Sequence, residues 1–260
     1  MFDCTDVADE LAASDDPRLD GTYLRCLPER DDRHTVVLVG VVHDHPASVT
    51  RIVRLLESLD PATLAVELPP LAMPLFRLYA DDDSHPPRLG GEMSAAIQAV
   101  DGETVGIDAP SVTYLRHLLG LIRRERPSLR VIGRLLKDLG TASTQALVSR
   151  AAGLVAAHTP VRPRVYTPIR HECSLVDTAA VQAGDERAYL DRRDALFRAI
   201  RPPESTRLID DARDAAMGSL LDRERRSGTV VAVVGMEHLD AVAAALQRLA
   251  GGPAASVELD

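Results

Sequence analysis

Residues 35–56 read TVVLVGVVHDHPASVTRIVRLL, and residues 229–249 read TVVAVVGMEHLDAVAAALQRL. Each stretch consists of a β-branched apolar run, the motif Gly-x-x-His and an amphipathic helical pattern, so the two form a loose internal repeat. Apolar runs of this kind predict strands that are buried on both faces. Because strands and helices alternate at both ends of the chain, we predict an α/β fold with a mostly parallel central sheet and helices on both faces.

Shorter patterns add further elements to this sheet. Besides the repeat strands at 35–40 and 229–235, we expect strands at 21–27, 64–67 and 104–107. The polar segment 29–33 is a predicted hairpin turn between the first two strands. Helical periodicity predicts helices at 48–59, 92–99, 205–226 and 239–249, and through most of 112–157. Helical structure is also expected from near residue 174 to the break at residues 201–203.

The chain divides into one large domain and two short ends. Residues 1–20 form an acidic N-terminal segment, residues 21–250 a single α/β domain, and residues 251–260 a tail. Within the domain, residues 118–203 interrupt the alternation of strands and helices, which predicts a helical insertion. The insertion either caps the crevice of the sheet or provides a dimer surface, so a homodimer is one predicted assembly.

The composition argues against several classes of protein. Acidic residues number 39 against 30 Lys and Arg, Lys137 is the single lysine, and the net charge is −9. This balance argues against a nucleic-acid partner. It favours a salt-rich cytoplasm, where an acidic surface stays hydrated, although a GC-rich genome would also favour Arg over Lys. Hydrophobic residues make up 45% of the chain and aromatic residues 3%, so we expect an aliphatic core.

The N-terminus and the cysteines bear on the compartment. The N-terminus is acidic, the reverse of a signal peptide, and no uncharged apolar run reaches ~18 residues. We therefore expect a cytoplasmic protein without a membrane span. Cys4, Cys26 and Cys173 are too few and too far apart in sequence to predict a disulfide framework or a cysteine-based zinc site.

Four polar residues follow or end predicted buried strands, namely His43, Glu67, Asp108 and His238. The carboxyl ends of parallel strands face one crevice, where ligands bind, so residues far apart in sequence can meet there. Each histidine also lies just before a predicted helix, whose positive end favours neutral imidazole. A single histidine after a strand is more often a capping or packing residue. Two in matched contexts, with a strand-end glutamate, favour a functional site.

Two histidines and a carboxylate form an adequate ligand set for a divalent metal that keeps open positions for water and substrate. We therefore predict that His43, Glu67 and His238 are metal ligands. Glu67 is also a candidate general base, and the sequence does not separate these two roles. Such a metal would acidify its bound water and polarise a carbonyl group.

Arg213 is the fourth candidate. It lies between Ile209 and Ala216 on the predicted apolar stripe of helix 205–226. An unpaired guanidinium there would be costly, so it must reach Glu67, a substrate carboxylate or an oxyanion, unless it extends along the surface to solvent. Together with Glu67, we assign it a predicted catalytic role.

Other polar residues have weaker signals. Glu92, Asp108 and Asp214 are candidate supporting or substrate-binding residues, although each has a local explanation as a helix-start, turn or salt-bridging acid. His45 precedes Pro46 and is expected in a loop. Residues 171–173 (His-Glu-Cys) follow a proline-rich connection, and we expect a structural role for them.

The ordered motifs resemble the TraB domain family, which includes TraB, PrgY and the animal Tiki proteins. That family has two Gly-x-x-His motifs with a glutamate ending the strand between them. Here these are Gly40-Val41-Val42-His43, Glu67 and Gly235-Met236-Glu237-His238. Further similar stretches are residues 91–97, 106–108 and 213–217. The chain departs from the family at Ala212, which is often glutamate there, and at Ala109, which is often arginine.

The resemblance implies a fold shared with erythromycin esterases and haem-binding ChaN-like proteins. Tiki proteins are metal-dependent proteases supported by manganese or cobalt, and TraB and PrgY are linked to blocking peptide pheromones. The resemblance thus implies His43 and His238 as ligands of manganese or cobalt, with Glu67 as a ligand or base. It also implies that Arg213 contacts the substrate or transition state. Zinc is a further candidate metal.

Three functions follow as hypotheses. The first is a metal-dependent hydrolase of the peptidase kind that acts on a peptide or a small amide or ester. The second is a non-catalytic protein that sequesters a peptide or a tetrapyrrole through Arg213 and the histidines. The third is a metal-free esterase in which His43 and Glu67 act as an acid/base pair.

Overall fold

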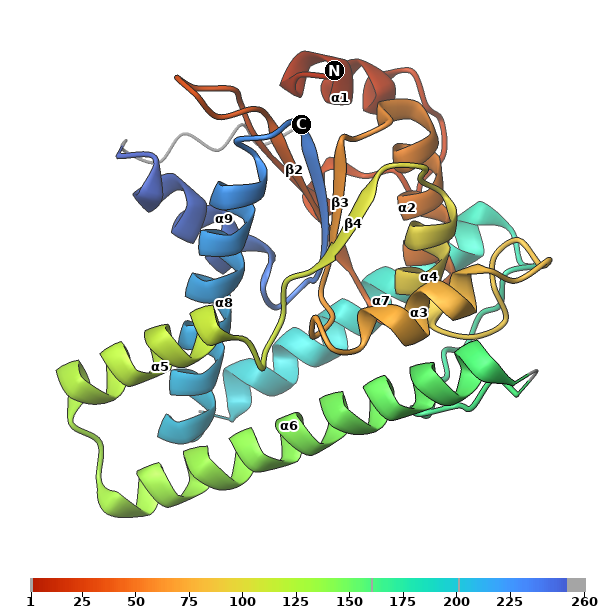
Figure 1. Cartoon of the computed structure of the whole chain (residues 1–260). Coiled ribbons are helices and arrows are strands. Elements are labelled where there is room, and N and C mark those ends of the chain that lie inside the picture. Colours follow the sequence, from red (N-terminus) through yellow and green to blue (C-terminus); the bar gives the residue numbers. More distant parts are fainter. Residues whose placement is uncertain (1, 160, 201, 252–260) are drawn as a thin grey trace.

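The computed structural model describes residues 2–159, 161–200 and 202–251. Within this part of the chain, five strands form one sheet in the order β1-β2-β5-β3-β4 (Figure 1). They are β1 (Leu24–Leu27), β2 (Val36–Val41), β3 (Thr63–Val66), β4 (Glu103–Gly106) and β5 (Val230–Gly235). Only the edge strand β1 is antiparallel to its neighbour, as the predicted hairpin with β2 requires. The α/β class and the mostly parallel sheet are confirmed.

The two repeat strands lie side by side at the centre of the sheet. β2 pairs in parallel with β5, in a register that runs from Val36 opposite Val230 to Val41 opposite Gly235. Each is followed by a helix, α2 (Pro46–Leu59) after β2 and α9 (Leu239–Leu249) after β5. The carboxyl ends of both strands, and the Gly-x-x-His segments after them, therefore lie at the same edge of the sheet.

Alternating strand side chains pack into two separate apolar clusters, because successive residues of a strand point to opposite faces. Val37 and Val39 join one cluster with residues of α2, α3 (Met73–Ala80) and α4 (Gly91–Gln98). Val36 and Leu38 join the other with residues of α8 (Glu204–Glu224) and α9. Figure 1 shows α8 and α9 on one side of the sheet and α2, α3 and α4 on the other.

Three helices lie in or next to the predicted insertion 118–203. They are α5 (Val112–Glu125), α6 (Leu129–His158) and α7 (Ala179–Ala199). α5 and α6 pack against α8, α6 also contacts α3, and α7 contacts α2. α5 begins before residue 118, so the boundaries of the insertion stay a prediction. Among the described residues, the helices are too short or too polar to cross a membrane.

The N-terminal segment carries an ordered helix, α1 (Cys4–Ala12), whose first turn is capped by a reciprocal pair of hydrogen bonds between Asp3 and Asp6. Cys4 forms a disulfide bond with Cys26 of β1. The spacing of the cysteines in the sequence did not predict this single bond, which forms because the fold brings α1 alongside the edge strand. A short 3-10 helix, η1 (Gly21–Tyr23), leads into β1. Of the predicted tail 251–260, residues 252–260 lie outside the described part of the chain.

Candidate functional site

Glu67 lies at the centre of a polar group at the C-terminal ends of the parallel strands. It follows β3, and its backbone N–H donates to the carbonyl oxygen of Val233 in β5 at 3.0 Å. One carboxylate oxygen, Oε2, accepts a hydrogen bond from the backbone N–H of Gly235 at 2.5 Å. The other, Oε1, accepts from Nη2 of Arg213 at 2.6 Å. Glu67 therefore links the ends of two strands to α8.

Arg213 carries the positive charge that balances this group. Its Nε and Nη2 donate to the two carboxylate oxygens of Asp108 at 2.8 and 2.9 Å, while Nη2 also donates to Glu67. The buried face of α8 passes through Leu208 and Ala212, whereas the expected stripe residue Ile209 is only half-buried. Arg213 thus lies at the edge of that face, and its side chain reaches inward to the acids. Burial alone would lower the pKa of Arg213, but the two carboxylates raise it above its ordinary value.

His238 is buried and contacts two acids. Its Nδ1 lies 2.6 Å from Oδ1 of Asp214, and its Nε2 lies 3.5 Å from Oε1 of Glu67. Burial alone would lower the pKa of His238, but the hydrogen bond to Asp214 and the charge of Glu67 together raise it. Because Asp214 accepts the Nδ1 proton, the ring directs Nε2 toward Glu67.

Burial acts in the opposite direction on Glu67. It raises the pKa of this carboxyl, and the nearby charges of His238 and Arg213 only partly offset it. A carboxyl held between a cation and a histidine, with a raised pKa, has the environment of a group that can exchange protons.

His43 lies at the same edge but has its own partner. Its Nδ1 is 2.7 Å from Oε1 of Glu92, whose other oxygen accepts the backbone N–H of Asp44 at 2.7 Å. Burial alone would lower the pKa of His43, but Glu92, with smaller contributions from Glu67 and Glu237, raises it to about 9. Glu92 is almost fully buried at the start of α4, so it fixes the position of the His43 ring.

Each acid predicted to support the site thus contacts one of the candidate residues His43, Arg213 and His238. Glu92 contacts His43, Asp108 contacts Arg213, and Asp214 contacts His238. The predicted metal ligands His43, Glu67 and His238 do not form a group whose ligand atoms all lie within 4.8 Å of one another. Where the structure describes the chain, His45, His171 and Asp185 are the group whose ligand atoms all lie within 4.8 Å of one another. The roles of His43, Glu67 and His238 as metal ligands stay a prediction.

This second group could hold a metal ion. His45 lies in the connection between β2 and α2, as expected. The residue is fully buried and is the N-cap of α2, where Nδ1 accepts the backbone N–H of Ala47 at 3.1 Å. Its Nε2 lies 3.2 Å from Oδ2 of Asp185 in α7 and 3.7 Å from Sγ of Cys173. The rings of His45 and His171 stack edge to face, with centroids 4.6 Å apart. Without a metal, burial and Asp185 raise the pKa of Cys173 to about 12, so the thiol stays protonated and is no ready nucleophile.

Hydrophobic periodicity did not reveal this group, since its residues come from three segments that look like loop and exposed helix. The signal that could have found it was local spacing of ligand-type residues, namely His-x-His at 43–45, His-x-Cys at 171–173 and Asp-Glu at 185–186. The three segments come together where α7 packs against α2 and His171 bonds to the backbone of His43.

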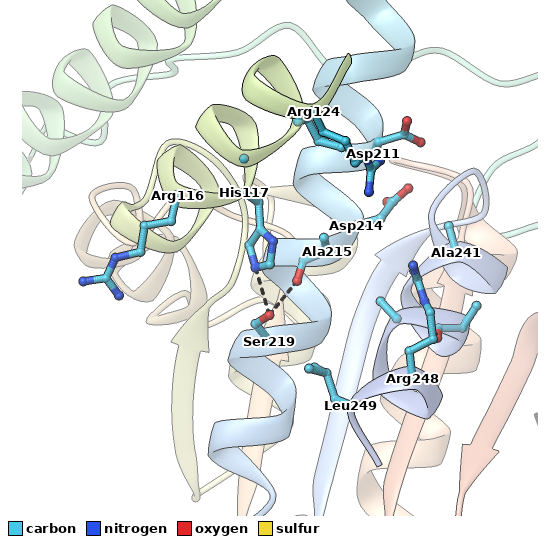
Figure 2. Close-up of a pocket in the computed structure, with 14 residues that line it drawn as sticks. Arg116, His117, Arg124, Asp211, Asp214, Ala215, Ser219, Ala241, Arg248 and Leu249 are labelled. Carbon is cyan, nitrogen blue, oxygen red and sulfur yellow. Dashed lines mark hydrogen bonds between the residues drawn. The ribbon is translucent and has the colours of Figure 1, made fainter. Parts of the chain in front are cut away.

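A cavity of about 680 Å³ lies between α5, α8 and α9 (Figure 2). Three arginines and His117 line it, and Nε2 of His117 donates to Oγ of Ser219 at 3.0 Å. Asp214 is the member of the Glu67 group that reaches this cavity. The cavity therefore reaches Asp214 of the His238–Asp214 pair, and Glu67 does not line it.

Comparison of the chain with models of protein families, with curated proteins and with solved structures found no match. The similarity to the TraB domain family therefore rests on the sequence motifs alone.

Proposed function

We propose that this protein is a metal-dependent hydrolase of the peptidase kind and a member of the TraB domain family. The observation that carries the proposal is the contact of Glu67 with both Arg213 and His238 at the carboxyl ends of the central strands. This edge is where ligands bind in open parallel sheets.

The orientation of the two histidine rings supports a metal site. Asp214 holds Nδ1 of His238, and Glu92 holds Nδ1 of His43. In each ring, Nε2 is therefore the nitrogen that would coordinate an ion. A carboxylate that fixes the second nitrogen of a histidine is the usual support for a metal ligand. His43, His238 and Glu67 would hold the ion, which by resemblance is manganese or cobalt, with zinc as a further candidate. Such an ion would lower the pKa of a bound water and polarise a substrate carbonyl.

The protein's own groups supply the remaining chemistry. Glu67, with its raised pKa, accepts a proton from the attacking water. Arg213 holds Glu67 in position and, through its bidentate contact, also fixes Asp108. The expected substrate is a peptide or a small amide or ester, and the expected location is the cytoplasm.

The alternative of a metal-free esterase has less support from the geometry. It requires His43 and Glu67 to act as a directly bonded pair, whereas His43 pairs with Glu92 and Glu67 pairs with Arg213. Sequestration of a peptide or tetrapyrrole without cleavage is the other alternative, and it is an outcome of the test below.

The test compares purified protein with the variants His43→Ala, Glu67→Gln and His238→Ala, and with His85→Ala as a control at an exposed histidine. We expect manganese or cobalt to stimulate cleavage of a peptide library by the parent and the control, and not by the three site variants. If no added ion supports cleavage while the parent still binds peptides and His43→Ala does not, the protein is a binder and the hydrolase proposal is wrong.

A further inference from the structure

A second set of metal-ligand atoms lies behind His43, on the side of α2 and α7. His45 is fully buried, Asp185 of α7 is half-buried, and His171 and Cys173 come from the connection between α6 and α7. Nε2 of His171 donates to the backbone carbonyl oxygen of His43 at 2.8 Å, so its Nδ1 keeps a free lone pair. This set shares no side chain with the site of the proposed function.

The separations match those of ligands on one ion. Bonds of about 2.0–2.3 Å to a tetrahedral zinc ion place neighbouring ligand atoms roughly 3.3–3.8 Å apart. Nε2 of His45 lies 3.2 Å from Oδ2 of Asp185 and 3.7 Å from Sγ of Cys173. The ligand atoms of His45, His171 and Asp185 all lie within 4.8 Å of one another. These three groups therefore need only small shifts to close around an ion, and Cys173, beside His45, is the candidate for the fourth ligand.

We propose that His45, His171, Cys173 and Asp185 form a structural metal site for zinc or a similar thiophilic divalent ion. Two imidazoles, a thiolate and a carboxylate complete a four-coordinate shell, which is closed and leaves no position for substrate. Thiolate and imidazole ligands favour zinc over the oxygen-preferring ions magnesium and calcium.

Metal binding moves two protons. The Cys173 thiol loses its proton to solvent as the S–H bond breaks and the metal–sulfur bond forms. In the metal-free protein Nδ1 of His45 accepts the Ala47 N–H, so the neutral ring carries its proton on Nε2. Coordination through Nε2 shifts that proton to Nδ1, which ends the hydrogen bond to Ala47. We therefore expect the amide resonance of Ala47 to move when the ion binds.

The site would add a further connection between three segments that already contact one another. It connects the start of α2, the segment before α7 and α7 itself, next to the buried contact between Glu186 of α7 and Arg51 of α2. Through His171 it also reaches the backbone of His43. The ion would thus hold the connection at residues 171–178 against the edge of the proposed active site.

Cobalt(II) provides the test, because a thiolate ligand gives it a near-ultraviolet charge-transfer band. The full chain, stripped with a chelator and kept non-reduced, is titrated with cobalt and then with zinc. We expect the band to appear with one equivalent of cobalt and to vanish when zinc displaces it. Cys173 is the free cysteine, since Cys4 and Cys26 are bonded to each other.

The variants locate the site. Cys173→Ser should abolish the band, and Asp185→Asn and His171→Ala should weaken cobalt binding at least about tenfold. Glu172→Gln, an exposed neighbour of two ligands, is the matched control and should bind like the parent. Circular dichroism of each variant shows whether it folds, and Cys173→Ser, a near-isosteric change, keeps the test valid if the histidine variant does not.

The proposal is overturned if stripped, folded protein shows no thiolate band with cobalt, or if the band persists in Cys173→Ser. The site of the proposed function contains no cysteine and cannot give this band. A His43→Ala/His238→Ala double variant that keeps the band but loses hydrolysis would support both proposals. A parent that hydrolyses peptides without the band would refute only this one.

Discussion

At the scale of single residues, Arg213 is the side chain on which the candidate site depends most. It neutralises two carboxylates, Glu67 and Asp108, and Glu67 is almost fully buried. Arg213→Met would leave both acids without their cation, so we expect the free energy of unfolding to fall by roughly 3 kcal/mol. Urea unfolding at neutral pH measures this change.

Two further variants test the cause of that loss. Arg213→Lys keeps the charge but not the two-pronged contact with Asp108, so it should recover part of the stability and little of the proposed activity. Asp108→Asn combined with Arg213→Met removes one of the two uncompensated acids and should be less destabilised than Arg213→Met alone. An Arg213→Met protein as stable as its parent would show that the acids do not need this cation.

His43 gives the site a dependence on pH. In the folded, metal-free chain its pKa is about 9 against an ordinary 6.5, because Glu92 and other acids outweigh the opposing effect of burial. The protonated ring therefore stabilises the folded state fully below pH 6.5, and this contribution is lost as the pH rises through about 9. Titration of the His43 ring resonances by NMR measures the pKa directly.

Glu92→Gln removes the main group that raises this pKa. We expect the His43 midpoint to fall toward its ordinary value, and the decline of stability between neutral and alkaline pH to become shallower. Glu57→Gln, an exposed acid on α2, should leave both unchanged. An identical His43 midpoint in Glu92→Gln and the parent would contradict this origin.

At the scale of elements, the sequence predicted the strands well, since buried parallel strands are continuous apolar runs. The predicted strand 229–235 differs from β5 by one residue, and 35–40 is shifted by one from β2. The strand ends then brought Glu67, Asp108 and His238 to one edge, which is why most of the Glu67 group could be predicted. Which acid contacts which candidate residue could not be predicted, because that pairing depends on side-chain packing.

One element, α3, and the buried face of α7 escaped prediction for physical reasons. α3 follows two prolines and has Pro74 in its first turn, so the segment was interpreted as a strand stop, although proline is tolerated at a helix start. The inward face of α7 is polar, with Gln182 and Glu186 buried, and hydrophobic periodicity cannot identify such a face. His45 was missed with it, because its partner Asp185 lies on that face.

The α7 face provides a test at this scale. Glu186 and Arg51 are both fully buried and form an ion pair, and Glu186 also accepts a hydrogen bond from Ser48 at 2.5 Å. Glu186→Ala would leave the Arg51 guanidinium buried without its partner, so we expect a loss of about 3–5 kcal/mol in the free energy of unfolding. Hydrogen exchange should show α7 opening first.

The matched controls separate a buried charge from a surface one. Replacing both partners, as Arg51→Met with Glu186→Leu, removes the uncompensated charge and should cost much less than Glu186→Ala. Arg207→Ala breaks exposed pairs with Asp211 and Glu125 and should change stability by less than about 1 kcal/mol. If Glu186→Ala costs no more than Arg207→Ala, the ion pair does not dock α7.

At the scale of the whole molecule, the Cys4–Cys26 disulfide joins the N-terminal helix to the edge strand across a sequence separation of 22 residues. It restricts the unfolded chain, and a loop of this length corresponds to about 3 kcal/mol of stability in the chain-entropy model. Such bonds persist in oxidising compartments and are rare in the cytosol, so this bond argues against the expected cytoplasmic location.

A Cys4→Ala/Cys26→Ala double variant tests this role, and it keeps Cys173 for comparison. We expect the free energy of unfolding to fall by about 3 kcal/mol, while the central strands keep their hydrogen-exchange protection because α1 packs mainly on α2 and the edge strand β1. Reduction of the parent with a thiol reagent should give the same loss and should not affect the double variant. Equal stability of parent and variant would mean that the bond does not constrain the unfolded chain, whereas loss of protection in β2 and β5 would mean that α1 is needed for the core itself.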